Sequence, residues 1–304
     1  MDKIIETCGG PLERIFLHWH ITNWCNYRCS YCPVLQQLTS DFRVEQHAPY
    51  KYLMAKLDHI DKPFRICITG GEPTLHPDLH AILNRLADNP MCEDIAMFTN
   101  LTRPVKFFEK LNELKEANKI AICASYHPEN VKIDVFTERC IAVSKLQPIN
   151  FSVHVNLVED ENEWDKTENF IKTMKDLGID VNPTLLSANE NYTPNPTQKF
   201  YDRFHKYFET GSEVNFRPVP VTYTDGTSEI LKDFEFEMRN LNKFKGYRCT
   251  PNTFQILMDG TIINSCNNSV LPLFLKSKNM LKEIDCPKDL CPSRAMLQSP
   301  KKRQ

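Results

Sequence analysis

The feature that most constrains the fold is a regular alternation of short apolar runs and amphipathic stretches across residues 15–186. The apolar runs have the length of β-strands, and the stretches between them repeat apolar residues at helical spacing. The predicted strands are Ile15–Ile21, Arg65–Thr69, Asp94–Thr99, Lys119–Ala124, Asn150–Val158 and Ile179–Leu186. The predicted helices are Tyr50–Ile60, Leu79–Leu86, Pro104–Ala117, Val135–Leu146 and Trp164–Leu177. This alternation predicts an α/β protein with a parallel sheet, arranged as a complete or partial barrel.

Polar residues occur where the predicted strands end. In parallel α/β proteins the carboxyl ends of the strands share one edge, and ligands bind there because the loops converge. The polar positions expected at this edge are the cysteine loop of residues 25–32, Gly70–Gly71–Glu72–Pro73, Thr99, Asn100, Ser125, His127, His154 and Asn156. The sequence therefore predicts one binding site built from several loops.

The loop after the first predicted strand contains three cysteines with the spacing Cys25-x3-Cys29-x2-Cys32. Three thiolates at these gaps can surround a compact inorganic core from a single loop. A [4Fe-4S] cluster has four irons, so three cysteines leave one iron without a protein ligand. An open position is typical of catalytic metal sites, so the loop indicates a reactive cluster. The alternative is three free thiols in a loop.

Two motifs together resemble the radical S-adenosylmethionine (SAM) enzymes: the three-cysteine loop, with Tyr31 before its last cysteine, and the Gly70–Gly71–Glu72–Pro73 turn. The resemblance covers roughly residues 12–190. It implies a partial (β/α)6 barrel in which SAM binds the open iron through its methionine amino and carboxylate groups. One electron, from a donor such as flavodoxin or ferredoxin, then cleaves SAM into methionine and a 5′-deoxyadenosyl radical.

The resemblance also implies which residues hold SAM. These cofactor-binding residues are Tyr31, Gly70, Gly71, Glu72, Pro73, Thr99, Asn100, Ser125 and Asn156. Gly70 and Gly71 would let the backbone approach the methionine, whereas Glu72 is expected to support the turn more than it touches the ligand. For the short polar residues at strand ends, the alternative is that they only satisfy turn backbone groups.

Cys123, in the fourth predicted strand, is the candidate catalytic residue. In family members that invert a stereocentre, an inward-facing thiol donates a hydrogen atom to the substrate radical. The alternative is that Cys123 is a small buried apolar residue, which is the usual role of a cysteine inside a strand.

Four further cysteines occur late in the chain, at positions Cys249, Cys266, Cys286 and Cys291. Apolar runs around Asp259–Gly260 predict a hairpin that brings the first two cysteines to one end, where the other two can join them. This segment resembles the twitch module, a shortened relative of the SPASM module, which binds a second, auxiliary [4Fe-4S] cluster. The family tends to place the hairpin glycine four residues before the second cysteine, whereas five residues separate Gly260 from Cys266 here. A tetrahedral zinc site is the alternative.

The domain boundary is expected near residue 240. Residues 1–240 would form the core barrel with a linker and a helical extension, including a helix at Lys199–Glu209 and partial helix within Glu229–Lys245. Residues 241–304 would form the twitch-like module.

Charge and hydropathy indicate which binding partners and which cellular compartment to expect. With 37 basic and 39 acidic residues, the charge balance does not predict a general affinity for nucleic acid or anionic membranes. The chain has no apolar run long enough for a membrane helix and no signal-peptide pattern, which predicts a cytoplasmic protein. In that compartment its 12 cysteines favour metal or redox roles over disulfides.

These observations predict a two-cluster radical SAM enzyme that acts on a small-molecule, glycan or peptide substrate. If the second cluster accepts an electron from the substrate radical, the product is oxidised; if a thiol returns a hydrogen atom, the product is an epimer. No leader-peptide-binding segment is recognisable, so a small or glycan-like substrate is preferred. The alternatives are a nucleic-acid-modifying radical SAM enzyme and a non-catalytic iron–sulfur or zinc protein on a degenerate barrel.

Overall fold

The computed structural model describes residues 3–7, 14–32, 47–157, 161–185, 198–208, 218–232, 235–236, 239–272, 276–291, 294–297 and 299–304. The chain divides into two compact units, each assembled from segments that are distant in sequence. Residues 19–48 and 67–211 form one unit, which we call the barrel unit. Residues 1–18, 49–66 and 212–304 form the other, which we call the tail unit. The predicted division at residue 240 stays a prediction.

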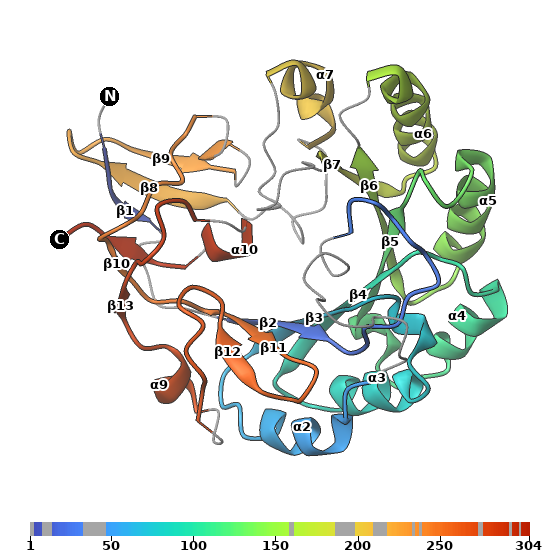
Figure 1. The fold of residues 1–304 in the computed structure, drawn as a ribbon, viewed down its shortest axis with the longest axis horizontal. Coiled ribbons are helices and arrows are strands. Elements are labelled where there is room, and N and C mark those ends of the chain that lie inside the picture. Colours follow the sequence, from blue (N-terminus) through green and yellow to red (C-terminus); the bar gives the residue numbers. More distant parts are fainter. Residues whose placement is uncertain are drawn as a thin grey trace. The chain divides into compact units, whose positions relative to one another are not determined.

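The barrel unit is built on strands that follow one another in chain order (Figure 1). It contains β4 (Cys92–Thr99), β5 (Ile120–Tyr126), β6 (Asn150–Leu157) and β7 (Asp180–Leu185), with the final residues of β2 (Ile15–His20) and β3 (Phe64–Thr69). Strands β4 to β7 pair in parallel, with Ser125 beside His154 and His154 beside Asn182. Since strand side chains alternate between faces, these three residues share a face. The predicted α/β architecture of a partial barrel is confirmed.

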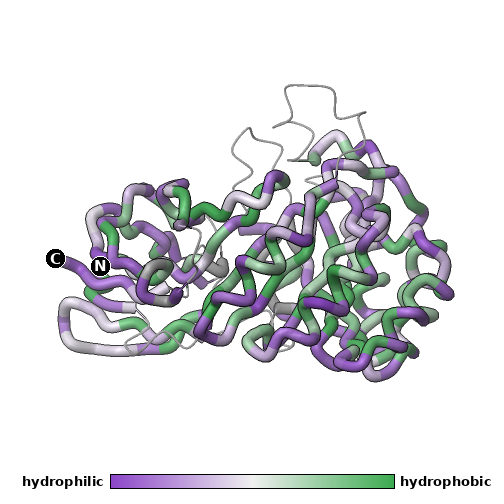
Figure 2. Tube along the Cα trace, turned by 90° about the horizontal axis from the view of Figure 1, so that it is seen from below, coloured by the Kyte–Doolittle hydropathy of each residue, from purple (hydrophilic) through white to green (hydrophobic). Residues whose placement is uncertain are grey.

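Helices cover the outer face of these strands (Figure 1). They are α3 (Leu79–Ala87), α4 (Val105–Asn112), α5 (Ile133–Ser144), α6 (Trp164–Asp176) and α7 (Gln198–Phe208), with short 3-10 turns η1 (Pro73–Leu75), η2 (Ala117–Lys119) and η3 (Glu161–Glu163). In α3 the buried positions Leu79, Ile82, Leu83 and Leu86 recur at helical spacing and form one apolar stripe. Hydrophilic and hydrophobic residues accordingly alternate along the helical parts of the trace (Figure 2).

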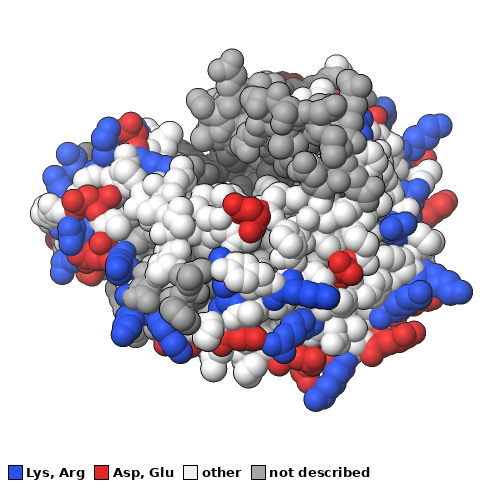
Figure 3. Space-filling view, turned by 60° about the horizontal axis from the view of Figure 1, so that its bottom comes forward, with Lys and Arg blue, Asp and Glu red and all other residues white. Residues whose placement is uncertain are grey.

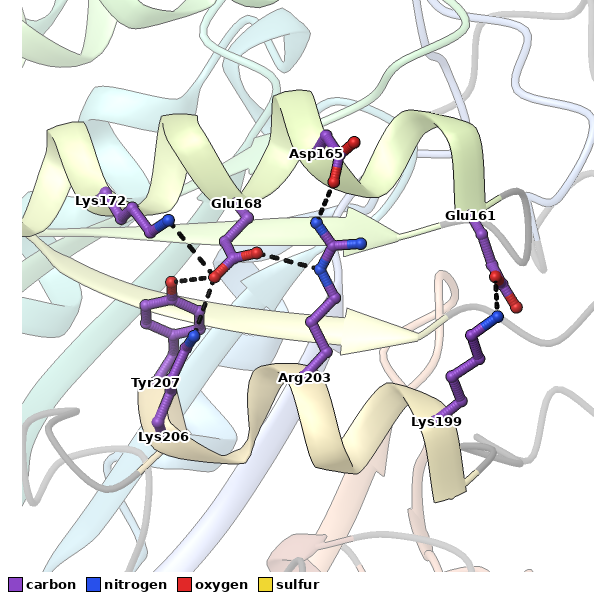
Figure 4. Close-up of polar contacts among 8 residues, drawn as sticks. All are labelled: Glu161, Asp165, Glu168, Lys172, Lys199, Arg203, Lys206 and Tyr207. Carbon is purple, nitrogen blue, oxygen red and sulfur yellow. Dashed lines mark hydrogen bonds and ion pairs between the residues drawn. The ribbon is translucent and has the colours of Figure 1, made fainter.

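An ion-pair network joins α6 to α7 (Figure 4). The Glu168 carboxylate accepts hydrogen bonds from Arg203 Nε at 3.0 Å, Lys206 Nζ at 2.9 Å and the Tyr207 hydroxyl at 2.7 Å. Although partial burial opposes the shift, the hydrogen bonds from Lys206, Tyr207 and Arg203 lower the pKa of Glu168 to about 2. Arg203 also pairs with Asp165. Helix α7 is therefore held to α6 by charge as well as by apolar contact.

The tail unit contains an antiparallel sheet whose described strands are ordered β13-β10-β14-β1-β8-β9. These are β1 (Ile4–Thr7), β8 (Val219–Tyr223), β9 (Ser228–Leu231), β10 (Arg248–Cys249), β13 (Ile284–Asp285) and β14 (Lys301–Lys302). The unit also contains α2 (Tyr50–Leu57), α9 (Ser277–Met280) and α10 (Arg294–Leu297). The first and last described strands, β1 and β14, pair directly, so both ends of the chain contribute to this sheet.

The predicted hairpin is present in the tail unit. Strands β11 (Thr253–Ile256) and β12 (Ile262–Asn264) are antiparallel, and Gly260 between them has a φ of +80°. That backbone conformation favours glycine, which explains the Asp259–Gly260 turn. The core of the unit consists of apolar residues from several of its strands together with all four late cysteines.

The structure differs from the predicted elements in several places. Strand β5 extends to Tyr126, so Ser125 lies within the strand and not after it. Strands β1, β8 and β9 were missed because they are short and gain their hydrogen-bond partners only from distant parts of the chain. The stretch Glu229–Lys245 begins in β9 and is helical at residues 235–236, so the expected partial helix is present beside a strand that was not expected. No helix among the described residues is both long enough and apolar enough to span a bilayer.

Candidate active site

One cavity of about 280 Å³ in the barrel unit brings the predicted cofactor-binding residues together. Its walls come from the cysteine loop, the turn after β3 and the ends of β4, β5 and β6. The predicted residues that line it are Cys25, Cys29, Tyr31, Cys32, Gly70, Gly71, Glu72, Pro73, Thr99, Asn100, Ser125 and Asn156. Asn23, Tyr27, Thr69, Phe98 and His127 also line it. The shared edge that the sequence predicts is thus a single concave site.

The Gly70–Gly71 turn packs directly against the backbone of the cysteine loop. The Gly71 N–H donates to the Thr22 carbonyl at 2.7 Å, and the Glu72 N–H donates to the Trp24 carbonyl at 2.8 Å. A Cβ on Gly70 would lie 2.3 Å from the Thr22 oxygen, and a Cβ on Gly71 would lie 2.2 Å from the Trp24 oxygen. The sequence predicts glycine at positions 70 and 71 because a ligand approaches the backbone there. In the structure, the close contact of this turn with the cysteine loop already leaves no room for a Cβ at either position.

Glu72 holds this turn to the end of β4. Its side chain is only 1% exposed. One carboxylate oxygen accepts from the Thr74 N–H at 3.0 Å and from the Thr74 and Thr99 hydroxyls at 2.7 and 2.8 Å. The other accepts from the Asn100 N–H at 2.7 Å. Burial raises the pKa of Glu72, while these hydrogen bonds oppose the rise. Both oxygens are therefore engaged in joining two strand ends.

The loop that follows β5 contacts the cysteine loop through residues that were not singled out from the sequence. The Glu129 carboxylate accepts from the Ser30 N–H at 2.7 Å and from the Ser30 hydroxyl. The Asn130 side chain donates to the Cys29 sulfur at 3.1 Å and accepts from the Arg28 N–H at 3.3 Å. The available sequence signal was a polar pair close after the end of a predicted strand, where ligand-side loops occur.

His127 packs within the same contact. Its Nδ1 lies 3.2 Å from the Tyr31 hydroxyl and 3.5 Å from the Cys29 sulfur. Its ring stacks on Tyr31 with centroids 6.1 Å apart and meets Tyr27 edge-on at 5.9 Å. Burial lowers the pKa of His127 to about 4, so the imidazole is neutral at neutral pH. His127 is therefore a neutral polar side chain beside the Cys29 sulfur and adds no positive charge to the site.

The three cysteines provide a donor set that fits an iron–sulfur cluster. All three cysteines line the same cavity, and N–H groups of Tyr27 and Asn130 donate to the sulfurs of Cys25 and Cys29 at 3.3 and 3.1 Å. N–H donors of this kind stabilise metal-bound thiolates. Burial raises the pKa of both Cys25 and Cys29 to about 11, so metal binding would have to displace their protons.

Within the described residues, no three His, Cys, Asp or Glu side chains are already arranged to hold one metal ion. In a [4Fe-4S] cluster each cysteine binds a different iron, so cluster ligands stand further apart than the ligands of a single ion.

Cys123 lies outside the residues that line this cavity. It is 2% exposed on β5, and its sulfur accepts a hydrogen bond from the Ser152 hydroxyl at 3.6 Å. Its role as a hydrogen-atom donor stays a prediction. On the same sheet face, Asn182 of β7 is 2% exposed, and neither polar atom of its amide has a partner in the described part of the chain. Sequence reasoning did not single out Asn182.

The four late cysteines meet in the core of the tail unit and are between 2% and 8% exposed. The Cys286 N–H donates to the Tyr247 carbonyl and the Cys291 N–H to the Asn242 carbonyl, each at 2.8 Å, which fixes this part of the backbone. A hydrogen bond between Cys249 and Cys266 raises the pKa of Cys249 and lowers the pKa of Cys266 to about 7. Four soft sulfur donors share this buried core, which suits an iron–sulfur cluster. A single zinc ion would require at least three of them to move closer together, because no three are arranged to hold one ion in the described part of the chain.

Comparison with known proteins relates this arrangement to one family. The family model described as the Radical SAM superfamily matches residues 19–193. GTP 3′,8-cyclase of Haemophilus influenzae (strain PittGG) is 26% identical over 252 residues, which cover 74% of this chain and 69% of the relative. GTP 3′,8-cyclase of Aquifex aeolicus is 30% identical over 196 residues, covering 58% and 57%.

Among solved structures, Streptococcus suis SuiB bound to the precursor peptide SuiA superimposes with a TM-score of 0.53 at 14% identity. The superposition covers 88% of this chain and 64% of SuiB, so the chain spans less than two thirds of that protein. At this identity, the superposition shows that this chain and SuiB have a similar fold.

Proposed function

Since this chain belongs to the radical SAM superfamily, we propose that it binds SAM in the cavity of the barrel unit and uses it to abstract a hydrogen atom from an organic substrate. Cys25, Cys29 and Cys32 would hold a [4Fe-4S] cluster with one iron open to SAM. When bound, the cluster supplies the electron that splits SAM into methionine and a 5′-deoxyadenosyl radical. Flavodoxin or ferredoxin is the proposed electron donor.

The observation that carries this proposal is one cavity that is lined by the three cysteines, the turn after β3 and the ends of β4 to β6. Backbone carbonyls of the Gly70–Gly71 turn are available to accept from the methionine ammonium. Thr99, Asn100, Ser125 and Asn156 offer hydroxyl and amide groups for the SAM carboxylate and ribose. Phe98 and Tyr27 add apolar wall, which helps to exclude water from a reactive radical.

The fate of the substrate radical depends on the tail unit. We propose that Cys249, Cys266, Cys286 and Cys291 hold a second [4Fe-4S] cluster, which would accept an electron and give an oxidised product. If Cys123 returns a hydrogen atom instead, the product would be an epimer. Because Cys123 is buried outside the cavity, the oxidation outcome is the better supported of the two.

A small or glycan-like molecule remains the preferred substrate, with a peptide next. A second candidate function comes from the relatives named GTP 3′,8-cyclase, one of which aligns with 74% of this chain. Their name describes ring formation on a nucleotide. Acidic and basic side chains are interspersed on the face shown in Figure 3, which favours a small substrate over a nucleic acid.

Anaerobic reconstitution tests the proposal. The loaded chain should carry about eight irons, four for each cluster, and form 5′-deoxyadenosine from SAM after reduction. Replacement of Cys25, Cys29 and Cys32 by Ala should abolish cleavage, whereas Cys249→Ala should leave part of it. Absence of any SAM cleavage by the loaded chain would contradict the proposed function.

Further measurements identify the substrate and distinguish oxidation from epimerisation. Cleavage of SAM is measured with GTP, with sugars or aminocyclitols, and with peptides, and consumption of each candidate is followed. Repeating the productive reaction in deuterated water shows whether solvent deuterium enters the product, as thiol donation requires. If Cys249→Ala changes neither the iron nor the zinc content, the tail cysteines hold no metal.

A further inference from the structure

Lys301 is a charged side chain buried in the core of the tail unit. It is 2% exposed, and its ammonium donates to three backbone carbonyls, those of Met296 at 2.7 Å, Ser299 at 2.9 Å and Leu297 at 3.4 Å. The same nitrogen lies 5.0 Å from the centre of the Phe244 ring. Its hydrogen-bonding capacity is thus used in full, since an ammonium has three N–H groups.

The charge of Lys301 lacks an opposite charge among the described side chains. Its hydrogen-bond partners are neutral carbonyls, and none of the ion pairs of the described residues includes it. Carbonyl oxygens and an aromatic face stabilise a cation but leave its net charge uncompensated. A buried ion without a counter-charge is strongly unfavourable, so a negative group is expected close by.

The neighbour on the same sheet face is Cys249. In the register of β10 and β14, Lys301 lies directly opposite Cys249, while Lys302 lies opposite Arg248. Directly opposed residues on antiparallel strands have Cβ atoms about 5 Å apart and project to the same side. Cys249 belongs to the buried core that also contains Phe244 and the other three late cysteines. Lys301 therefore borders the buried core that contains the four late cysteines, opposite Cys249 and over Phe244.

We propose that Lys301 is the counter-ion of a metal centre with four thiolate ligands in the tail unit. The inference rests on the proposed role of the late cysteines and adds the residue that compensates their charge. Four thiolates carry more negative charge than one Zn²⁺ or one oxidised [4Fe-4S] core can neutralise, so either centre would be anionic. Lys301 would stabilise the loaded site, and would favour the reduced, more negative state of a cluster.

The test uses the full chain in a background in which Cys25, Cys29 and Cys32 are Ala, so that only tail metal remains. Lys301→Met removes the charge and keeps a long apolar stem, and Lys301→Arg keeps the charge. Lys302→Met is the matched control, because Lys302 is the exposed neighbour on the same strand. Iron and zinc content, metal release to a chelator and thermal unfolding with and without metal are measured.

Lys301→Met should release tail metal at least about tenfold faster than the background chain, the low end of the usual effect of an outer-sphere partner. The rise in Tm on metal loading should also be smaller in Lys301→Met. The comparison uses the Tm with metal minus the Tm without metal. Loss of the carbonyl hydrogen bonds lowers both values, so its cost cancels in the subtraction. Lys301→Arg should behave as the background chain does, as should Lys302→Met.

Equal metal release and equal metal-dependent Tm rise in Lys301→Met and Lys302→Met would overturn the proposal for Lys301 while leaving the tail metal centre intact. A background chain that binds neither iron nor zinc would overturn the tail metal centre and the counter-ion together. Metal-dependent loss in Lys301→Met that Lys301→Arg rescues would support the proposal.

Discussion

The side-chain nitrogen of Asn130 donates a hydrogen bond to the sulfur of Cys29 at 3.1 Å, although the two residues are 101 positions apart. The contact joins the loop after β5 to the cysteine loop. Hydrogen bonds to ligand sulfurs stabilise the thiolate and raise the reduction potential of a bound cluster. Asn130 is therefore placed to influence both cluster retention and cluster potential.

Asn130→Leu should weaken cluster retention by roughly 10-fold and lower the midpoint potential of the SAM-binding cluster, because the sulfur loses its donor. Iron content and a redox titration followed by electron paramagnetic resonance measure the two effects. Asn150→Leu, at the exposed start of β6, is the control. An unchanged potential in Asn130→Leu would show that the contact does not act on the cluster.

Gly71→Ala should destabilise the chain by at least about 2 kcal/mol and reduce cluster loading, since its Cβ would lie 2.2 Å from the Trp24 carbonyl oxygen. The neighbouring atom is backbone, so the loop has to move. Gly178→Ala provides the comparison. At Gly178 a Cβ meets nothing within 4 Å, and only the positive φ of 73° adds strain, of about 1 kcal/mol. Urea unfolding should rank Gly71→Ala as the more destabilising change, and a reversed order would contradict the assignment.

Glu168 should make the stability of the barrel unit dependent on acidic pH. Its pKa is about 2 in the folded chain, against an ordinary value of 4.5, so its contribution is complete above pH 4.5 and is lost as pH falls towards 2. Glu168→Gln should lower the free energy of unfolding by about 2 kcal/mol at pH 7 and by much less near pH 2.5. Lys172→Gln, which removes an exposed partner at 3.5 Å, should cost less than about 0.5 kcal/mol. A pH-independent effect of Glu168→Gln would argue against the ion-pair network.

Asn182→Leu should raise the free energy of unfolding of the ligand-free chain by about 1 kcal/mol. Asn182 is 2% exposed and its amide has no partner among the described residues, whereas leucine of similar volume has no polar atoms to satisfy. Thermal unfolding of both variants in the absence of SAM measures the change, and Asn150→Leu should have little effect. Destabilisation by Asn182→Leu would mean that the amide is satisfied in solution, for example by an ordered water.

Much of this molecule was predictable because its signals are local. The alternation of apolar runs and helical stretches depends on neighbouring residues, and it correctly predicted β2 to β7 and the helices between them to within a few residues. The cysteine spacing and the Gly70–Gly71 turn were readable for the same reason. Since parallel strands place their carboxyl ends on one edge, the sequence also indicated that Thr99, Ser125 and Asn156 would meet the cysteine loop, and they line its cavity.

Contacts between distant segments were decided only by the tertiary structure. Pairing of β1 with β14, the approach of Gly71 to Trp24 and the hydrogen bond from Asn130 to Cys29 each depend on where loops are placed by the whole sheet. The burial of Lys301 also could not be predicted from the sequence, because a lysine near a chain end is normally solvated. Strand pairing buries it opposite Cys249. The sequence by itself determined the order of the helices and strands and the kinds of metal-binding and hydrogen-bonding side chains that the chain contains. The tertiary structure decided which of these side chains lie together. The physical reason is that burial and charge compensation depend on residues that are close in space, which can be far apart in sequence.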